Sequence, residues 1–331
     1  MIHHCLSKIQ LNKLMVDITS LKDDINRDVH EMFNFKGTIF LDCGIFNRYR
    51  RQLTLDYLKD YRDKLIEKYT LLKPDIASAL DIPALLWHDI NTKKERTEWS
   101  LQNYLYMREK LKGITLVLGV CGFSKKSVTL VSERVKSIIG SPEILGIGGL
   151  VPLIRRATYR PELGRIVVRT ISLFRINFPD SFIHAFGAGG HRWYILTRFA
   201  GATSSDSSSV IQSTMKWHIL IPGEGARHLS MDKAKTKTEI AKPNEVEKLK
   251  NCECPTCKNN DISILERDKN ALLIHNLFVT LNEARIVDEI CERNDKREIL
   301  KHLKDRFLSH HSFLKPVAKE LIKVVTTSKL Y

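Results

Sequence analysis

The sequence lacks any long hydrophobic run. Of its 331 residues 43% are hydrophobic, yet they never form the stretch of about eighteen apolar residues that a membrane helix needs. The first 24 residues also have no apolar core of the signal-peptide type. We therefore expect no membrane partner and a cytoplasmic location. A chain of this length and composition can bury a large core, and it fits either one large barrel or two ordinary domains.

Acidic residues are scarce relative to basic ones. The chain has 53 Lys and Arg against 38 Asp and Glu, a net charge of +15. Such an excess favours a polyanionic partner, nucleic acid above all. The plainer alternative is a basic surface that only keeps the protein soluble.

Cysteine is too unevenly spread for a disulfide framework. There are seven cysteines, an odd number, and three of them lie in "CECPTC" at 252–257. This crowding suits a metal site in a reducing compartment. The other four are expected to be thiols: Cys5, Cys43, Cys121 and Cys291.

Short apolar runs alternate with longer segments of helical period between residues 37 and 210. The runs lie at 37–46, 74–83, 114–122, 144–152, 181–189 and 202–210. The helical segments lie at 53–72, 92–112, 124–139, 160–175 and 191–200. This alternation predicts an α/β fold with parallel strands joined by helices. Further strands are expected from the first 36 residues and from "MKWHILIPG" at 215–223.

Polar side chains and glycines at the ends of these runs favour a closed barrel over a doubly wound sheet. They are Asp42, Asp81, Cys121, Gly148, Gly149, His184 and Asp206. A (β/α)8 barrel brings the carboxyl ends of all its strands to one mouth, where such enzymes hold their active sites.

The remainder of the chain divides into two parts. Residues 223–251 are polar and rich in lysine, which predicts a mobile loop, and helical patterns follow at 268–292, 296–309 and 312–327. We therefore expect the main part of the barrel in 1–222, a polar loop and metal-binding subdomain in 223–290, and C-terminal helices packed on the barrel in 291–331.

The cysteine cluster predicts a structural zinc site. Cys252, Cys254 and Cys257 offer three sulfurs from one tight turn, and His275 has no rival among residues 229–300 as a fourth ligand. Three Cys and one His are a typical tetrahedral zinc set. Four protein ligands leave no position for a reacting water, so the chemistry must lie elsewhere.

Six segments in order resemble the tRNA-guanine transglycosylase family from about residue 37 to 290. They are "FLDCGIF", "ALDIP", "GIGGLVPLI", "HAFGAGG", "SSDSSS" and "CECPTC" with "HNLFVTLNEAR". The resemblance implies a (β/α)8 barrel with a zinc-bearing subdomain that exchanges guanine in a polynucleotide for a free 7-deazaguanine base.

The resemblance also implies roles for individual residues. Asp206 falls on the family's nucleophile, Asp42 on its general acid and base, and Asp81 on the carboxylate that binds N1 and the 2-amino group of the purine. Gly148, Gly149 and Leu150 match the segment lining the base pocket, while Cys121 replaces a glutamine there. An isolated aspartate is more often a helix cap, so these roles depend on the order of the motifs.

Three departures point to a DNA substrate. "CGIFNRYRR" follows the first aspartate, the glutamine is lost, and the sequence shows no long C-terminal extension of the kind archaeal tRNA enzymes use. With "SSDSSS", this is more similar to the DpdA-like paralogues of phages and bacterial modification systems, which insert bases such as preQ0 into DNA. The same reaction on tRNA, a non-catalytic nucleic-acid-binding subunit and a hydrolytic glycosylase remain alternatives, and a homodimer is possible.

Nucleic acid must reach the mouth, and basic runs follow two of the strands. Arg48, Arg50 and Arg51, then Arg155, Arg156 and Arg160, are expected to meet phosphates, or else form a solvated basic face. The target guanine must be flipped out or unpaired, and Phe46, Tyr49 or Tyr159 is placed to stack in the vacated space, unless it is core. His184 is interpreted as a core histidine. "GAGG" at 187–190 is either a phosphate cradle or a tight turn.

Overall fold

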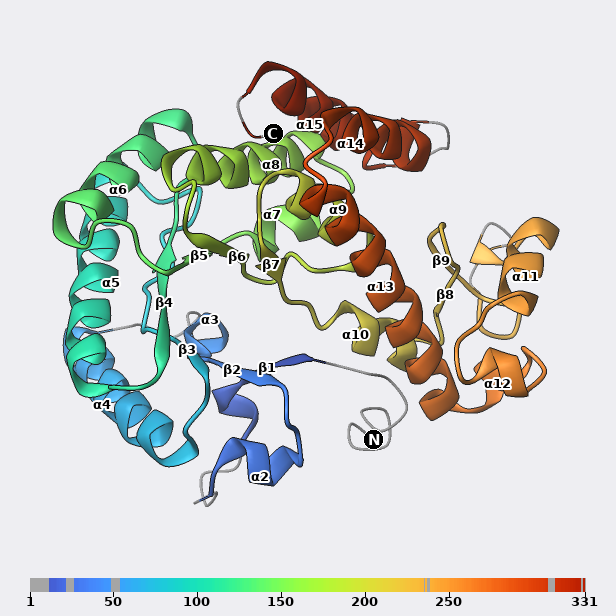
Figure 1. The fold of residues 1–331 in the computed structure, drawn as a ribbon, viewed down its shortest axis with the longest axis horizontal. Coiled ribbons are helices and arrows are strands. Elements are labelled where there is room, and N and C mark those ends of the chain that lie inside the picture. The colour runs from blue at the N-terminus through green and yellow to red at the C-terminus, as the bar shows by residue number, and fades with distance from the viewer. Residues whose placement is uncertain are drawn as a thin grey trace.

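A curled parallel sheet forms the centre of the computed structural model, which describes residues 12–21, 27–48, 54–234, 236, 239–308, 313–328 and 330. Its seven strands lie in chain order, and each pairs in parallel with the next (Figure 1). They are β1 (Lys13–Asp17), β2 (Thr38–Asp42), β3 (Ile76–Ser78), β4 (Thr115–Val120), β5 (Ile144–Ile147), β6 (Phe182–Ala185) and β7 (Ser204–Ser205). The α/β prediction is confirmed, and β1 comes from the first 36 residues as expected.

Helices cover the outer face of the sheet where the 3.6-residue period predicted them (Figure 1). The helices between the strands and after β7 are α2 (Val29–Phe33), α3 (Ile45–Arg48), α4 (Leu55–Leu72), α5 (Ile90–Lys110), α6 (Lys125–Ile138), α7 (Val151–Arg156), α8 (Pro161–Asn177), α9 (His191–Phe199) and α10 (Ser209–Met215). Side-chain caps fix several starts: Thr54 accepts from the amide of Tyr57, and Ser124 forms a capping box with Ser127.

The segment expected to add a further strand to the sheet lies elsewhere, so that prediction is wrong. Within 215–223 the strand is β8 (Ile219–Leu220), which pairs antiparallel with β9 (Ala226–Arg227) in a separate two-stranded sheet. Its apolar side chains bury against Leu249, Leu272 and the cysteine cluster rather than against the central core. The complete eightfold barrel stays a prediction.

The polar segment 223–251 is more ordered than its composition predicted. Besides β9 it contains α11 (Pro243–Lys250), which begins with a proline in its first turn. Glu245 and Leu249, four residues apart on one face, are buried, and Glu245 binds the guanidinium of Arg227 at 3.0 Å. A helix with so few apolar residues leaves almost no periodic signal, because one buried ion pair replaces part of the usual apolar stripe.

The remaining helices follow the predicted pattern closely. They are α12 (Ile264–Arg267), α13 (Lys269–Glu292), α14 (Lys296–Leu303), a π-helical turn (Lys304–Leu308) and α15 (Lys315–Thr327). α13 runs between the central sheet and the β8–β9 region, α15 lies beside α8, and α14 packs against α15 (Figure 1). Arg306 of the π-helical turn donates to Glu283 of α13 and to the carbonyl of Gly223, which joins these parts. Among the described residues, no helix is long and apolar enough to cross a membrane.

Candidate active site and metal centre

Asp206 directly follows the short strand β7 and is held by the loop after β6. Its Oδ1 accepts a hydrogen bond from the amide of Gly187 at 2.6 Å and is 3.2 Å from Nε2 of His184. Its backbone carbonyl accepts from the amide of Gly189 at 2.7 Å. Gly187 has φ +67°, a conformation that favours glycine. Two backbone amides of "GAGG" thus donate hydrogen bonds to Asp206 rather than to a phosphate. This favours the tight turn over the phosphate cradle.

His184 is buried in β6 beside Asp206, a contact that the sequence did not reveal. Its Nδ1 lies 2.8 Å from Oγ of Ser204, and its ring packs edge-on against Phe40 and Phe186. A carboxylate oxygen only accepts hydrogen bonds, so Nε2 of His184 is the donor to Asp206. The interpretation as a core histidine is correct in part, but this side chain also orients Asp206. His184 lies opposite Ser204 in the parallel pairing of β6 and β7, and Ser204 is two residues before Asp206. This register brings His184 close to Asp206.

Asp42 ends β2 and shares the mouth with other carboxyl groups. Its Oδ1 accepts from the hydroxyl of Ser78 at 2.9 Å. Burial raises the pKa of Asp42 to about 6, the Ser78 hydrogen bond opposes this rise, and the charges of Asp206 and Asp17 add to it. Asp17 is the register partner of Asp42 at the end of β1 and was not predicted as part of the site.

Asp81 lies past the end of β3, close to Asp42. Burial, together with the charge of Asp42, raises the pKa of Asp81 to about 7. The thiol of Cys43 donates to its Oδ1 at 3.7 Å. A methyl group on Gly119 of β4 would lie 2.5 Å from Cβ of Asp81, so the approach of β4 to this side chain requires glycine. The structure therefore brings Asp42, Asp81 and Asp206 together at one mouth.

The expected base-pocket residues surround Asp81. A methyl group on Gly148 would lie 3.3 Å from Sγ of Cys121 and 3.4 Å from Oδ2 of Asp81. Burial raises the pKa of Cys121 to about 12, so this thiol stays protonated. A cavity of about 10 Å³ lies behind Asp81 and Cys121 against α5. That is room for one water molecule and not for a larger group.

Basic and aromatic side chains surround the mouth unevenly. Arg155 and Arg156 are exposed at the end of α7, and the guanidinium of Arg156 lies 5.6 Å from the ring centroid of Trp87. Trp87 is 55% exposed and was missed in the sequence, while Tyr159 is 78% exposed. Arg48 ends α3, and Tyr49, Arg50 and Arg51 lie outside the described residues.

The four predicted metal ligands meet in a buried cluster. Nδ1 of His275 lies 3.7 Å from the sulfur of Cys252 and 3.4 Å from those of Cys254 and Cys257, and all four ligand atoms lie within 4.8 Å of one another. Tetrahedral zinc with ordinary Zn–S and Zn–N lengths requires roughly 3.5 Å between sulfur and nitrogen. The cluster can therefore hold zinc.

A second hydrogen bond prepares His275 for this role. Its Nε2 donates to the carbonyl of Leu220 in β8 at 2.9 Å, which leaves Nδ1 unprotonated and directed at the sulfurs. The neighbouring Asn276 accepts from the amide of Leu220 and donates to the carbonyl of His218. The metal centre thus joins α13 to the segment that leads back through α10 to Asp206. Of the other cysteines, Cys43, Cys121 and Cys291 are buried thiols, as expected, and Cys5 lies outside the described residues.

Comparison with known proteins finds a distant relative. A tRNA-guanine(15) transglycosylase of Sulfolobus acidocaldarius is 22% identical over 298 residues, covering 86% of this chain and 54% of that protein. The chain thus spans about half the length of this curated relative. No family model matches the sequence.

The similarity covers most of this chain. The predicted relationship with the tRNA-guanine transglycosylase family is therefore confirmed. The closer likeness to the DNA-acting paralogues stays a prediction.

Proposed function

We propose that this protein is a DNA-guanine transglycosylase, which exchanges guanine in DNA for a 7-deazaguanine base such as preQ0. The observation that carries the proposal is the position of Asp206, fixed by two donors on one oxygen beside carboxyl groups of raised pKa. This arrangement matches the needs of a double displacement at a sugar carbon.

In the first displacement Asp206 attacks C1′ of the target nucleotide. Gly187 and His184 occupy Oδ1, so Oδ2 is the attacking atom. The bond from C1′ to N9 of guanine breaks as the bond from C1′ to Oδ2 forms. Asp42 is the proton donor to the departing purine, because a pKa raised from 3.8 to about 6 leaves part of this carboxyl group protonated near neutral pH.

The second displacement reverses these roles. The incoming 7-deazaguanine attacks C1′ through N9, and the bond to Oδ2 breaks. Asp42, now ionised, takes the proton from N9 and returns to its starting state. Atoms and charges balance without water, and two inversions retain the configuration at C1′.

Asp81 serves as the base-reading group in this proposal. In its ionised form, which a pKa of about 7 leaves accessible near neutral pH, the carboxylate of Asp81 accepts hydrogen bonds from N1 and the 2-amino group of guanine, an edge that 7-deazaguanine shares. Cys121, with Gly148, Gly149 and Leu150, forms the remainder of the pocket. Cys121 is a protonated thiol, so it offers a weak donor where the family has a glutamine.

Zinc has a structural role here. Cys252, Cys254, Cys257 and His275 would fill its coordination sphere, and the ion would stabilise the packing of α13 against β8. The proton and the sugar are handled by Asp42 and Asp206, at the mouth rather than in this cluster.

Release of labelled guanine tests the proposal. Purified protein is incubated with preQ0 and either guanine-labelled DNA, single-stranded or duplex, or labelled tRNA, and the nucleosides are analysed by mass spectrometry. We expect 7-deazaguanine in DNA. Exchange confined to tRNA would instead establish the second candidate, which the similarity to the Sulfolobus acidocaldarius tRNA enzyme favours.

Two further outcomes would overturn the proposal. Abasic sites that form without added base would show a hydrolytic glycosylase. Binding of nucleic acid without any guanine release, with zinc bound and the protein folded, would show a non-catalytic subunit.

A further inference from the structure

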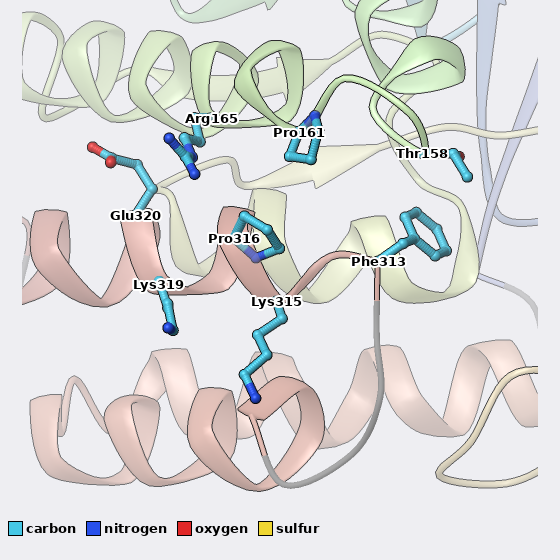
Figure 2. Close-up of a pocket in the computed structure, with 8 residues that line it drawn as sticks. All are labelled: Thr158, Pro161, Arg165, Phe313, Lys315, Pro316, Lys319 and Glu320. Carbon is cyan, nitrogen blue, oxygen red and sulfur yellow. The ribbon is translucent and has the colours of Figure 1, made fainter.

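A second feature of the fold is an open cavity of about 820 Å³ between α8 and α15, away from the carboxyl groups. Its lining residues are Thr158, Pro161, Arg165, Phe313, Lys315, Pro316, Lys319 and Glu320 (Figure 2). We name it the α8–α15 groove. None of these residues takes part in the base exchange proposed above.

The groove carries an excess of positive charge. Lys315 and Lys319 form no ion pair or hydrogen bond with any residue in the described part of the chain. Arg165 is close enough to Glu320 for its charge to help Arg169 lower the pKa of that carboxyl group. Glu320 is the groove's acidic residue, and its carboxylate is bound by Arg169 at 2.6 Å. The cationic side chains are therefore available to an anion from outside.

Helix α15 adds to this charge at its N-terminus. Its first turn has no acidic residue, and Leu314 at the cap position provides no side-chain acceptor for the free amides. Phe313, just before the helix, is 46% exposed. An anion with apolar groups attached fits this combination better than a simple ion does.

The topology places the groove on the same side of the molecule as the mouth. In a parallel α/β fold each helix begins near the carboxyl end of the strand before it, and α7 and α8 follow β5. The exposed Arg155, Arg156 and Tyr159 lie in the chain between the base-pocket glycines and the start of α8. Basic side chains thus follow the chain from the base-pocket glycines to the start of α8, where the groove begins.

We infer that the α8–α15 groove binds the phosphate backbone of the nucleic acid whose guanine enters the mouth. This inference rests on the proposed function for the identity of the ligand. It goes further by assigning a distinct binding surface to the C-terminal helix. Phosphates contact Lys315, Lys319 and Arg165, several nucleotides away from the flipped base.

Binding measurements test this without any chemistry. Fluorescence anisotropy with labelled single-stranded DNA and with RNA of the same sequence is compared for the full-length protein and Lys315→Ala/Lys319→Ala. We expect about tenfold weaker binding at low salt. The slope of log K against log salt should fall by about 1.4, or 0.7 per lost phosphate contact. The DNA and RNA arms show which polynucleotide the groove prefers.

The matched control is Lys59→Ala/Lys64→Ala on the exposed face of α4, which removes the same charge and should leave binding within twofold of the unmodified protein. The inference is wrong if the groove variant binds both nucleic acids with unchanged affinity and salt slope, or if both double variants lose the same affinity. It is equally wrong if polyglutamate of matched charge competes as well as the oligonucleotide does.

If the double variant unfolds, the single substitution Lys319→Glu at an exposed position replaces it in the test. This charge reversal should weaken nucleic-acid binding at least as much as the double substitution. Failure of base exchange with intact groove-dependent binding would overturn the proposed function and leave the groove assigned. Base exchange together with binding that does not depend on the groove would support the proposed function and overturn the assignment of the groove.

Discussion

The mouth and the metal centre each bring together acidic groups whose charges repel one another when they are ionised. The two sites reduce this repulsion in opposite ways. In the metal centre, three thiols and an imidazole surround a space that fits a dication. At the mouth, burial above all, and then the charges of Asp206 and Asp17, make ionisation of Asp42 costly. Anionic groups that are neutralised by a bound cation stabilise a fold. Acidic groups without such a cation have raised pKa values and keep protons that a reaction can use.

The largest effect is expected from Asp206→Asn. The variant keeps an acceptor for Gly187 but lacks a nucleophilic oxygen, so base exchange should fall by about 10³-fold or more. Guanine release measures this, and Ser207→Ala is the matched control. Trapping of a covalent adduct on another residue would contradict the mechanism.

Removal of the metal should act on stability instead of chemistry. Cys257→Ala, or chelation, leaves buried polar ligands without their cation and should lower the free energy of unfolding by at least about 3 kcal/mol. Thermal unfolding and zinc content per chain measure this. Cys291→Ala, a buried thiol outside the cluster, should retain its zinc. Equal stability with and without zinc would refute the structural role.

His184 tests how far the mouth depends on orientation. His184→Leu removes the donor to Oδ1 of Asp206 and should lower kcat about 10- to 100-fold with little change in KM. His184→Gln, which retains an N–H donor, should recover part of the loss. Identical kcat values for the two variants would show that His184 only fills space.

Asp42→Asn should abolish exchange and yet stabilise the protein above pH 6. The folded-state pKa of Asp42 is raised from 3.8 to about 6, so folding favours its protonated form. Stability is complete below about pH 4 and is lost as pH rises through 6. The substitution should therefore gain no more than about 3 kcal/mol at pH 8 and almost nothing at pH 4. Chemical denaturation at both pH values measures this; a gain at pH 4 alone would contradict it.

The smallest effect concerns the edge of the mouth. Arg156→Ala removes one exposed charge and its contact with Trp87. Nucleic-acid affinity should fall only a few-fold, with a salt slope smaller by about one. An unchanged slope in the anisotropy assay would place this arginine outside the interface.

Local patterns sufficed to predict the helices, the parallel strands and the metal ligands. The cysteines lie in one short turn, and α4, α5, α6 and α8 each bury a periodic apolar face, so these features are encoded by neighbouring residues. The contact of His184 with Asp206, the antiparallel pairing of β8 and the helix α11 depend on segments distant in the chain. The α8–α15 groove likewise exists only because α15 packs on α8. Such tertiary contacts leave no periodic trace in a single sequence.

The loop after β6 holds both the side chain and the backbone of Asp206, although it belongs to the preceding β/α unit. The position of the Asp206 carboxyl group therefore does not depend on the serines that follow it. Substitutions in those serines should leave the carboxyl group of Asp206 in its place.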